Sequence, residues 1–195
     1  MRSIALATIL LLGTATAAVS QNKPNTTFVS GDAAVTYHWV RTNTQPGACG
    51  CFDLNGGGVS GSWNLRPRVA AVAEIGVEHT GNGPSANSLT LTSYLAGARY
   101  LLPQPRLGGD RAPQPFAQLL LGGGHAGGGI AGAGDASNAF VSRVGGGIDV
   151  PVSSRIAVRV IQADYYLTKF ANTVNDHQNN LLLGAGVIFH WSRQR

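Results

Sequence analysis

The segment 141–167 constrains the fold most, because it reads as two strands joined by a tight turn at residues 152–155. Before the turn, one face carries Arg143 and Asp149 among glycines, and the opposite face carries apolar residues such as Ile148. This alternation has the period of two that is typical of a strand. A soluble sandwich buries its apolar face, whereas a barrel in lipid turns that face outward. The segment therefore raises the question of whether the chain has enough hairpins to close a ring.

The N-terminus has the pattern of a secretory signal. Arg2 precedes an apolar run at residues 4–12, which is too short to span a bilayer, and small residues follow it. Cleavage is expected after Ala17 or after Ser20. The expected organisation is a signal peptide at 1–20, a periplasmic leader at 21–31 and a barrel at 32–195.

The composition excludes some classes of protein. Charged residues make up only 12% of the chain, which is unusual for a small secreted domain but suits an outer wall that faces lipid. The net charge of +5 raises the question of nucleic-acid binding. No basic run is interleaved with aromatic residues, and export also argues against such a partner, so we expect no nucleic acid.

Eight segments alternate in the manner of strands, and each has about ten residues, enough to cross a bilayer when tilted. They are residues 32–41, 57–66, 69–80, 88–102, 116–125, the two halves of the 141–167 hairpin, and 180–191. The connections after the odd-numbered strands are long and polar, as in the outer loops of an outer-membrane barrel. Lipid tolerates no open sheet edge, so the first strand must pair with the last. We predict an all-β fold, an eight-stranded antiparallel up-and-down transmembrane β-barrel.

Aromatic residues are predicted to fall toward the strand ends, as in the aromatic belts of membrane proteins. They are Tyr37, Trp39, Trp63, Tyr94, Tyr100, Phe189 and Trp191.

Four short motifs resemble a known family. They are Glu-Ile-Gly-Val-Glu at 74–78, Leu-Ala-Gly-Ala-Arg-Tyr at 95–100, Gly-Gly-Ile-Asp at 146–149, and the closing Gly-Val-Ile-Phe-His-Trp at 186–191. In order and spacing they resemble the transmembrane domain of outer membrane protein A and its small barrel relatives. In that family, inward acidic and basic side chains pair across the lumen and plug it. The resemblance implies that Glu74 faces Arg159 and that Arg99 faces Asp149.

The sequence departs from the family pattern in three places. Its last strand ends in Trp191 followed by Ser-Arg-Gln-Arg, where the family's insertion signal usually ends in Phe. No peptidoglycan-binding domain follows residue 195, so no cell-wall tether is expected. Gln162 and Asp164 have the opposite parity to Arg159. Either a bulge near Ile161 turns both inward, or Asp164 lies at the outer rim.

The lumen charges are the main candidate site. An eight-stranded interior is just wide enough for side chains to fill, so paired charges are tolerable there and single ones are costly. The pairs either act as a gate for a narrow water path or form a static plug that fixes strand register; we favour the plug. The predicted ion-pair residues are Glu74, Arg99, Asp149 and Arg159, and the other predicted lumen polar residues are His38, Asn64, Glu78, Arg143 and His190.

The two cysteines are Cys49 and Cys51, in a predicted outer loop. They are interpreted as a loop-tip dithiol or local disulfide without a catalytic role. With His79 or His125 from another loop they could hold a metal, but two thiolates are a weak metal signal. We expect no metal and no cofactor.

Two sequence patterns are similar to enzyme motifs, but neither is sufficient to predict an enzymatic activity. His190-Trp191-Ser192 is similar to the His-x-Ser of a lipid A deacylase barrel, yet it lies at the periplasmic end and no acid follows it. The glycine runs 122–124 and 127–129 precede no Gly-Lys-Ser/Thr, so they are flexible loop or close-packed strand rather than phosphate loops. No catalytic residues are predicted.

The predicted function is that of an outer-membrane barrel with a structural or surface-interaction role, whose specificity lies in four outer loops. The alternatives are a narrow gated pore, a lipid-modifying enzyme and a soluble lipocalin-like barrel. The expected partners are outer-membrane lipid and lipopolysaccharide, the barrel-assembly machinery during insertion, and an extracellular ligand at the outer loops. The expected location is the bacterial outer membrane.

Overall fold

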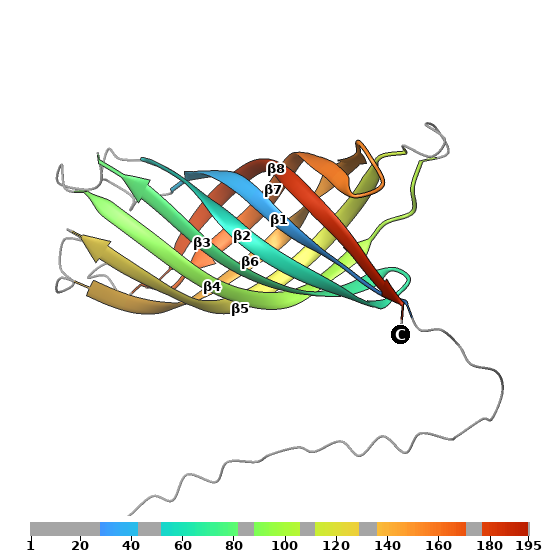
Figure 1. The fold of residues 1–195 in the computed structure, drawn as a ribbon. Helices are drawn as coiled ribbons and strands as arrows, with labels where there is room; N and C mark the ends of the chain where they lie inside the picture. Colours follow the sequence, from blue (N-terminus) through green and yellow to red (C-terminus); the bar gives the residue numbers. More distant parts are fainter. Residues whose placement is uncertain are drawn as a thin grey trace, which may run out of the picture.

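The computed structural model describes residues 28–42, 52–81, 88–105, 112–128, 136–170 and 177–194. Eight strands account for nearly all of them (Figure 1). They are β1 (Phe28–Arg41), β2 (Asp53–Arg66), β3 (Val69–Thr80), β4 (Leu89–Leu101), β5 (Gln114–Gly128), β6 (Ala136–Pro151), β7 (Ile156–Thr168) and β8 (Gln178–Gln194). Within these ranges no helix is long and apolar enough to cross a membrane.

The strands form one closed barrel in which each strand pairs antiparallel with its sequence neighbours, and β1 pairs with β8. The seam runs from Phe28 opposite Gln194 to Arg41 opposite Leu181. The predicted fold class is therefore confirmed. Figure 1 shows the C-terminus at the end of the barrel that carries the β2–β3 turn. Short turns and termini lie on the periplasmic side of such barrels, so the opposite end is the outer end.

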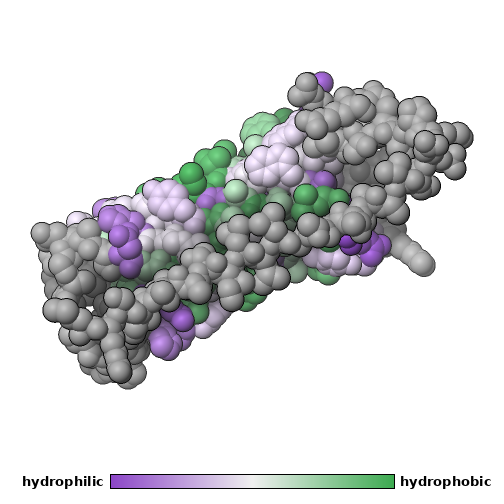
Figure 2. All heavy atoms as spheres, turned by 90° about the horizontal axis from the view of Figure 1, so that it is seen from below, coloured by the Kyte–Doolittle hydropathy of each residue, from purple (hydrophilic) through white to green (hydrophobic). Residues whose placement is uncertain are grey.

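The barrel is inverted relative to a soluble protein. Large apolar side chains stand on its outer wall; Ile75 is 53% exposed and Val160 is 51% exposed. On one face of the molecule, hydrophobic residues gather over the middle of the wall (Figure 2). Glu74 and Arg159 lie inside and are nearly inaccessible. Period-two alternation thus directs apolar residues toward lipid and charges into the lumen, as predicted.

Several strand boundaries differ from the prediction. β1 begins at Phe28 rather than at residue 32, so residues 28–31 belong to the barrel and not to a leader. β2 begins at Asp53 and includes the glycines at 56–58, because the hairpin ladder continues through small residues that carry no apolar signal. The signal peptide and the rest of the predicted leader lie outside the described residues.

The glycine run 122–124 is close-packed strand, not loop. A Cβ atom on Gly122 would come within 1.9 Å of the carbonyl oxygen of Tyr94 on β4. A Cβ on Gly97 would come within 2.0 Å of the carbonyl oxygen of Leu119 on β5. The two strands therefore approach each other more closely at these positions than residues with side chains allow.

A bulge on β7 sets the position of two polar residues. The register with β6 shifts so that Ile148 lies opposite Ile161 but Asp149 lies opposite Arg159. Val160 and Ile161 consequently both face outward, and Gln162 and Asp164 turn inward. Of the two alternatives that the sequence leaves open, the inward one is correct, and Asp164 is fully buried rather than at the outer rim.

The aromatic belt is only partly as predicted. Trp63, Tyr100 and Phe189 are exposed on the outer wall toward the periplasmic end. Tyr94 is exposed as well, but it lies opposite Ile75 in the middle of β3 and so stands within the apolar band.

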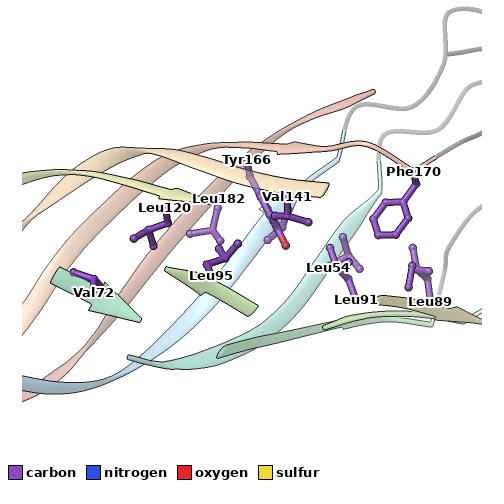
Figure 3. Packing of buried hydrophobic residues seen from close by; sticks show 12 residues of the cluster. Leu54, Val72, Leu89, Leu91, Leu95, Leu120, Val141, Tyr166, Phe170 and Leu182 are labelled. Atoms are coloured by element: carbon purple, nitrogen blue, oxygen red, sulfur yellow. The ribbon is translucent and has the colours of Figure 1, made fainter. Parts of the chain in front are cut away.

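The interior has two kinds of contents. Toward the outer loops it holds an apolar cluster, hereafter the apolar layer (Figure 3). Its buried members are Val40, Leu54, Val72, Leu89, Leu91, Leu95, Leu120, Ala126, Val141, Tyr166, Phe170 and Leu182. The rest of the interior holds a small second apolar cluster of Ala34, Ala157 and Ile188 and a larger group of charged and amide side chains, hereafter the ionic layer. The inward-facing leucines of β4, which are Leu89, Leu91 and Leu95, form part of the apolar layer.

Candidate functional site

Arg143 on β6 is at the centre of the ionic layer and is fully buried. Its Nη2 lies 2.7 Å and its Nε 3.2 Å from Oδ2 of Asp164 on the neighbouring β7. Its Nη1 donates a hydrogen bond to Oε1 of Glu74 on β3, across the lumen. One guanidinium group therefore joins two carboxylates from opposite walls, and each carboxylate is compensated by charge and by hydrogen bonds.

Asp164 collects further donors. Gln162 Nε2 lies 2.6 Å from its Oδ2, and Gln118 Nε2 on β5 lies 3.2 Å from the same oxygen. The bulge on β7 brings Gln162 and Asp164 to the inner face, so this meeting point depends on the register shift. A fully buried carboxylate with donors from three strands is satisfied without water.

Arg159 forms the second pair. Its Nε and Nη2 lie 2.8 Å and 3.1 Å from the two carboxylate oxygens of Asp149, a bidentate arrangement. Its Nη1 donates to Oε1 of Gln162 at 2.8 Å. Since Gln162 also donates to Asp164, the two ion pairs belong to one continuous network.

Arg99 on β4 joins the network through an amide. Its Nε and Nη2 lie 3.4 Å and 3.3 Å from Oε1 of Gln118. Its Nη1 is 3.7 Å from Oδ1 of Asp32 on β1. The guanidinium groups of Arg99 and Arg159 also lie 4.7 Å and 4.5 Å from the centre of the Phe116 ring, within the range of cation–π attraction.

His38 on β1 forms the remaining branch. Its Nδ1 lies 2.8 Å from Oε1 of Glu78, and its Nε2 lies 2.8 Å from Oγ1 of Thr36. Oε1 of Glu74 is 4.0 Å from the same Nε2. His38 therefore lies between the two carboxylates that β3 directs into the lumen.

Neither a scan against protein-family models nor a search of curated proteins returns a match for this sequence. Solved structures do match. Ail, the attachment invasion locus protein of Yersinia pestis, is 12% identical, the match covers 83% of this chain and 98% of Ail, and the TM-score is 0.54. Neisserial surface protein A is 18% identical, with 83% and 95% covered and a TM-score of 0.55. A second Ail structure, in complex with the heparin analogue sucrose octasulfate, is 13% identical, with 84% and 99% covered and a TM-score of 0.55.

The fold is that of the small eight-stranded outer-membrane barrels. At these identities the likeness extends to the fold and no further. A closed ring with an apolar outer wall is the arrangement of a barrel that spans the bacterial outer membrane, and this is the location of the chain.

The predicted charged residues of this small outer-membrane barrel do lie in the lumen, but the pairing implied by the family resemblance is wrong. Glu74 pairs with Arg143 rather than with Arg159, and Asp149 pairs with Arg159 rather than with Arg99. Asp149 and Arg159 are register partners on adjacent strands, so the shortest connection is within one hairpin.

Two predicted lumen residues lie outside the network. Asn64 and His190 are both exposed near the periplasmic ends of their strands. Asn64 Nδ2 donates to Oγ of Ser30 at 2.6 Å. Both residues are on the inward face of their strands, but so close to the strand end that their side chains lie at the mouth of the barrel, where water reaches them.

Sequence reasoning missed Asp32, Gln118 and Thr36 as members of the network. Each lies on the inward face of its strand, so parity alone identifies the face. Asp32 on β1 lies near Arg99 on β4, and Gln118 on β5 donates to Asp164 on β7, so these partners depend on which non-adjacent strands meet. A single strand pattern carries no information on that.

Among the described residues, no group of three or more His, Cys, Asp and Glu side chains is placed to hold an ion. His79 Nδ1 lies 2.9 Å from Oγ1 of Thr90, and His125 Nδ1 lies 2.9 Å from Oδ1 of Asn138. Cys49 and Cys51 lie outside the described residues.

Proposed function

We propose that the chain is a closed outer-membrane barrel that serves as a rigid, non-catalytic support for surface interaction, with its outer loops supplying the specificity. The observation that carries this proposal is the pair of layers in the interior. The ionic layer joins carboxylates and guanidinium groups from opposite walls, and the apolar layer packs against it and fills the lumen toward the outer loops. A rigid support requires strands that are held in one register, and it does not require an open channel.

The filled interior argues against the gated pore. A water path through the ionic layer requires Arg143 to leave Glu74 or Asp164, which are 4% and 0% exposed. Separating a buried pair costs about 3–5 kcal/mol when one charge is left without a partner. The same path must also wet Leu120 and Leu182, both fully buried, and an apolar constriction disfavours water.

The surface role is supported by the barrels with the same fold. One of them is named as an attachment invasion locus protein and another as a surface protein. Ail was also solved in complex with the heparin analogue sucrose octasulfate. We propose outer-membrane lipid and lipopolysaccharide as the surroundings of this chain, the assembly machinery as its partner during insertion, and an extracellular ligand at its loops.

Planar-bilayer recording of the purified full chain tests the closed lumen. We expect negligible conductance for the wild type and for the variants Glu74→Gln and Arg143→Met, because the apolar layer remains in place. The matched control is Arg155→Met, which removes an exposed arginine of the β6–β7 turn. Stable single-channel steps in the wild type, or steps that appear only in the two lumen variants, would overturn the closed lumen in favour of the gate.

Attachment of cells that display the barrel tests the surface role. Replacing the outer loops with short Gly-Ser connections should abolish attachment while heat-modifiable migration on a gel shows that the barrel still folds. Attachment that survives the loss of all outer loops contradicts the proposal.

A further inference from the structure

A pocket opens at the outer rim, at the ends of β1, β2 and β3. Its volume is about 460 Å³, within the range of small-molecule sites. The residues that line it include Arg41, Phe52, Asp53, Asn55 and His79. The pocket is distinct from the ionic layer.

Three of the polar side chains have unused hydrogen-bonding groups. Asn55 accepts from Tyr37 through Oδ1, and His79 contacts Thr90 through Nδ1. Asp53 contacts Arg41 through Oδ1 alone. Among the described residues, no bond is made by Oδ2 of Asp53, Nδ2 of Asn55 or Nε2 of His79.

The register brings these groups together. Arg41 lies opposite Asp53 on β1 and β2, and Asn55 lies opposite His79 on β2 and β3. Asp53 and Asn55 are two residues apart on one strand and so share a face. A carboxylate acceptor, an amide donor and an imidazole nitrogen therefore converge on one space.

The charge balance of the pocket favours an uncharged ligand. The guanidinium of Arg41 is compensated by Asp53, 2.9 Å away, and His79 has no net charge when neutral. A sulfated or phosphorylated group would lie beside the Asp53 carboxylate with no uncompensated cation in the pocket, so an anion is disfavoured. Neighbouring hydroxyl groups of a sugar both donate and accept, which matches the unused groups.

We propose that this outer-rim pocket binds an uncharged sugar unit of a glycan, with Asp53, Asn55 and His79 as its hydrogen-bonding residues. The inference rests on the proposed surface role and names its ligand class. The glycan comes either from another cell's surface or from the bacterium's own polysaccharide, and both offer the same neutral hydroxyl chemistry.

Saturation-transfer NMR on the full chain tests this, in a phosphocholine detergent because sugar-headed detergents would compete. The probes are lactose, maltose and N-acetylglucosamine oligomers in one arm and neutral core oligosaccharide released from lipopolysaccharide in the other. Sucrose octasulfate is the anionic comparison. We expect transfer to a neutral sugar in at least one arm, which identifies the source, and weaker transfer to the octasulfate.

Matched variants locate the site. Asn55→Ala and His79→Ala should each weaken sugar binding about five- to tenfold, the effect of one lost hydrogen bond to a ligand. Asn179→Ala on β8 and His125→Ala on β5 remove the same groups from hydrogen-bonded pairs that do not line the pocket and should leave binding unchanged.

Three outcomes overturn the inference: no transfer to any neutral sugar, equal losses in pocket and control variants, or a preference for the octasulfate. Cell attachment that depends on the outer loops while pocket variants attach normally would overturn the pocket alone and leave the proposed surface role standing. Attachment that survives loop replacement contradicts the surface role itself.

Discussion

The apolar layer and the ionic layer fill the same lumen by different means. In the apolar layer, Leu120 and Leu182 are fully buried and need only shape complementarity. In the ionic layer, Arg143 and Asp164 are equally buried, but each is tolerable only with its partner present. The outer wall faces lipid rather than water, so the hydrophobic effect does not close the barrel. The packing of the interior therefore specifies how the strands pair.

The difference between the layers lies in what a single substitution leaves behind. Loss of a leucine leaves a cavity whose cost depends on how far the neighbours relax. Loss of Arg143 leaves two carboxylates, Glu74 and Asp164, buried without a cation. Since Arg143 joins β6 to β3 across the lumen, the ionic layer specifies which walls face each other, whereas the apolar layer fills the space between them.

The largest expected effect is therefore that of Arg143→Ala. We expect the free energy of unfolding to fall by about 3–5 kcal/mol, because two buried carboxylates lose their cation. Urea titration of the barrel refolded in lipid vesicles measures it. Arg155→Ala, in the exposed β6–β7 turn, is the control and should change stability by less than about 0.5 kcal/mol. A loss below about 1 kcal/mol for Arg143→Ala would show that water reaches this layer.

Leu182→Ala tests the other half of the comparison. It should lower the free energy of unfolding by about 3 kcal/mol through a cavity in the apolar layer. Leu119→Ala is the control, because Leu119 is 48% exposed on the outer wall and lipid can fill the space. Equal losses at the two positions would contradict a well-packed apolar layer.

The two layers also differ in how far sequence could predict them. Alternation with a period of two identifies the inward face of most strands, including that of β3 with Glu74 and Glu78. The inward leucines of β4 look like faults in that pattern, and only the closed barrel shows that Leu89, Leu91 and Leu95 converge with leucines from other strands. Sequence gives the face of a residue but not its neighbours across the lumen.

For a related reason, the sequence alone does not predict which charged residues pair. Asp149 meets Arg159 only because of the register shift on β7, and Arg143 meets Glu74 only because β6 and β3 lie across the lumen. A shift of one residue changes the face of everything that follows, so the partners cannot be assigned before the bulge is located. Parity and the bulge together are sufficient to bring Asp164 inside.

The Asp149–Arg159 pair should show an intermediate effect. Asp149 lies nearer the periplasmic mouth, and its side chain is 14% exposed, whereas that of Arg159 is inaccessible. Asp149→Asn should cost about 1–2 kcal/mol, because water and Gln162 partly compensate the arginine. The same urea titration measures it. A loss as large as that of Arg143→Ala would mean that water has no better access to Asp149 than to Arg143.

The smallest effect is expected at the outer rim, where Arg41 and Asp53 form a pair at 2.9 Å with side chains 46% and 37% exposed. The geometry resembles that of the buried pairs, but water replaces a lost partner there, so Asp53→Asn should change the free energy of unfolding by no more than about 0.5 kcal/mol. Its small contribution should also decline between low and high salt, whereas the loss caused by Arg143→Ala should persist because ions do not penetrate the ionic layer. Urea titrations at two salt concentrations measure both. If the two pairs respond alike to salt, exposure is not what separates a register-fixing pair from a surface one.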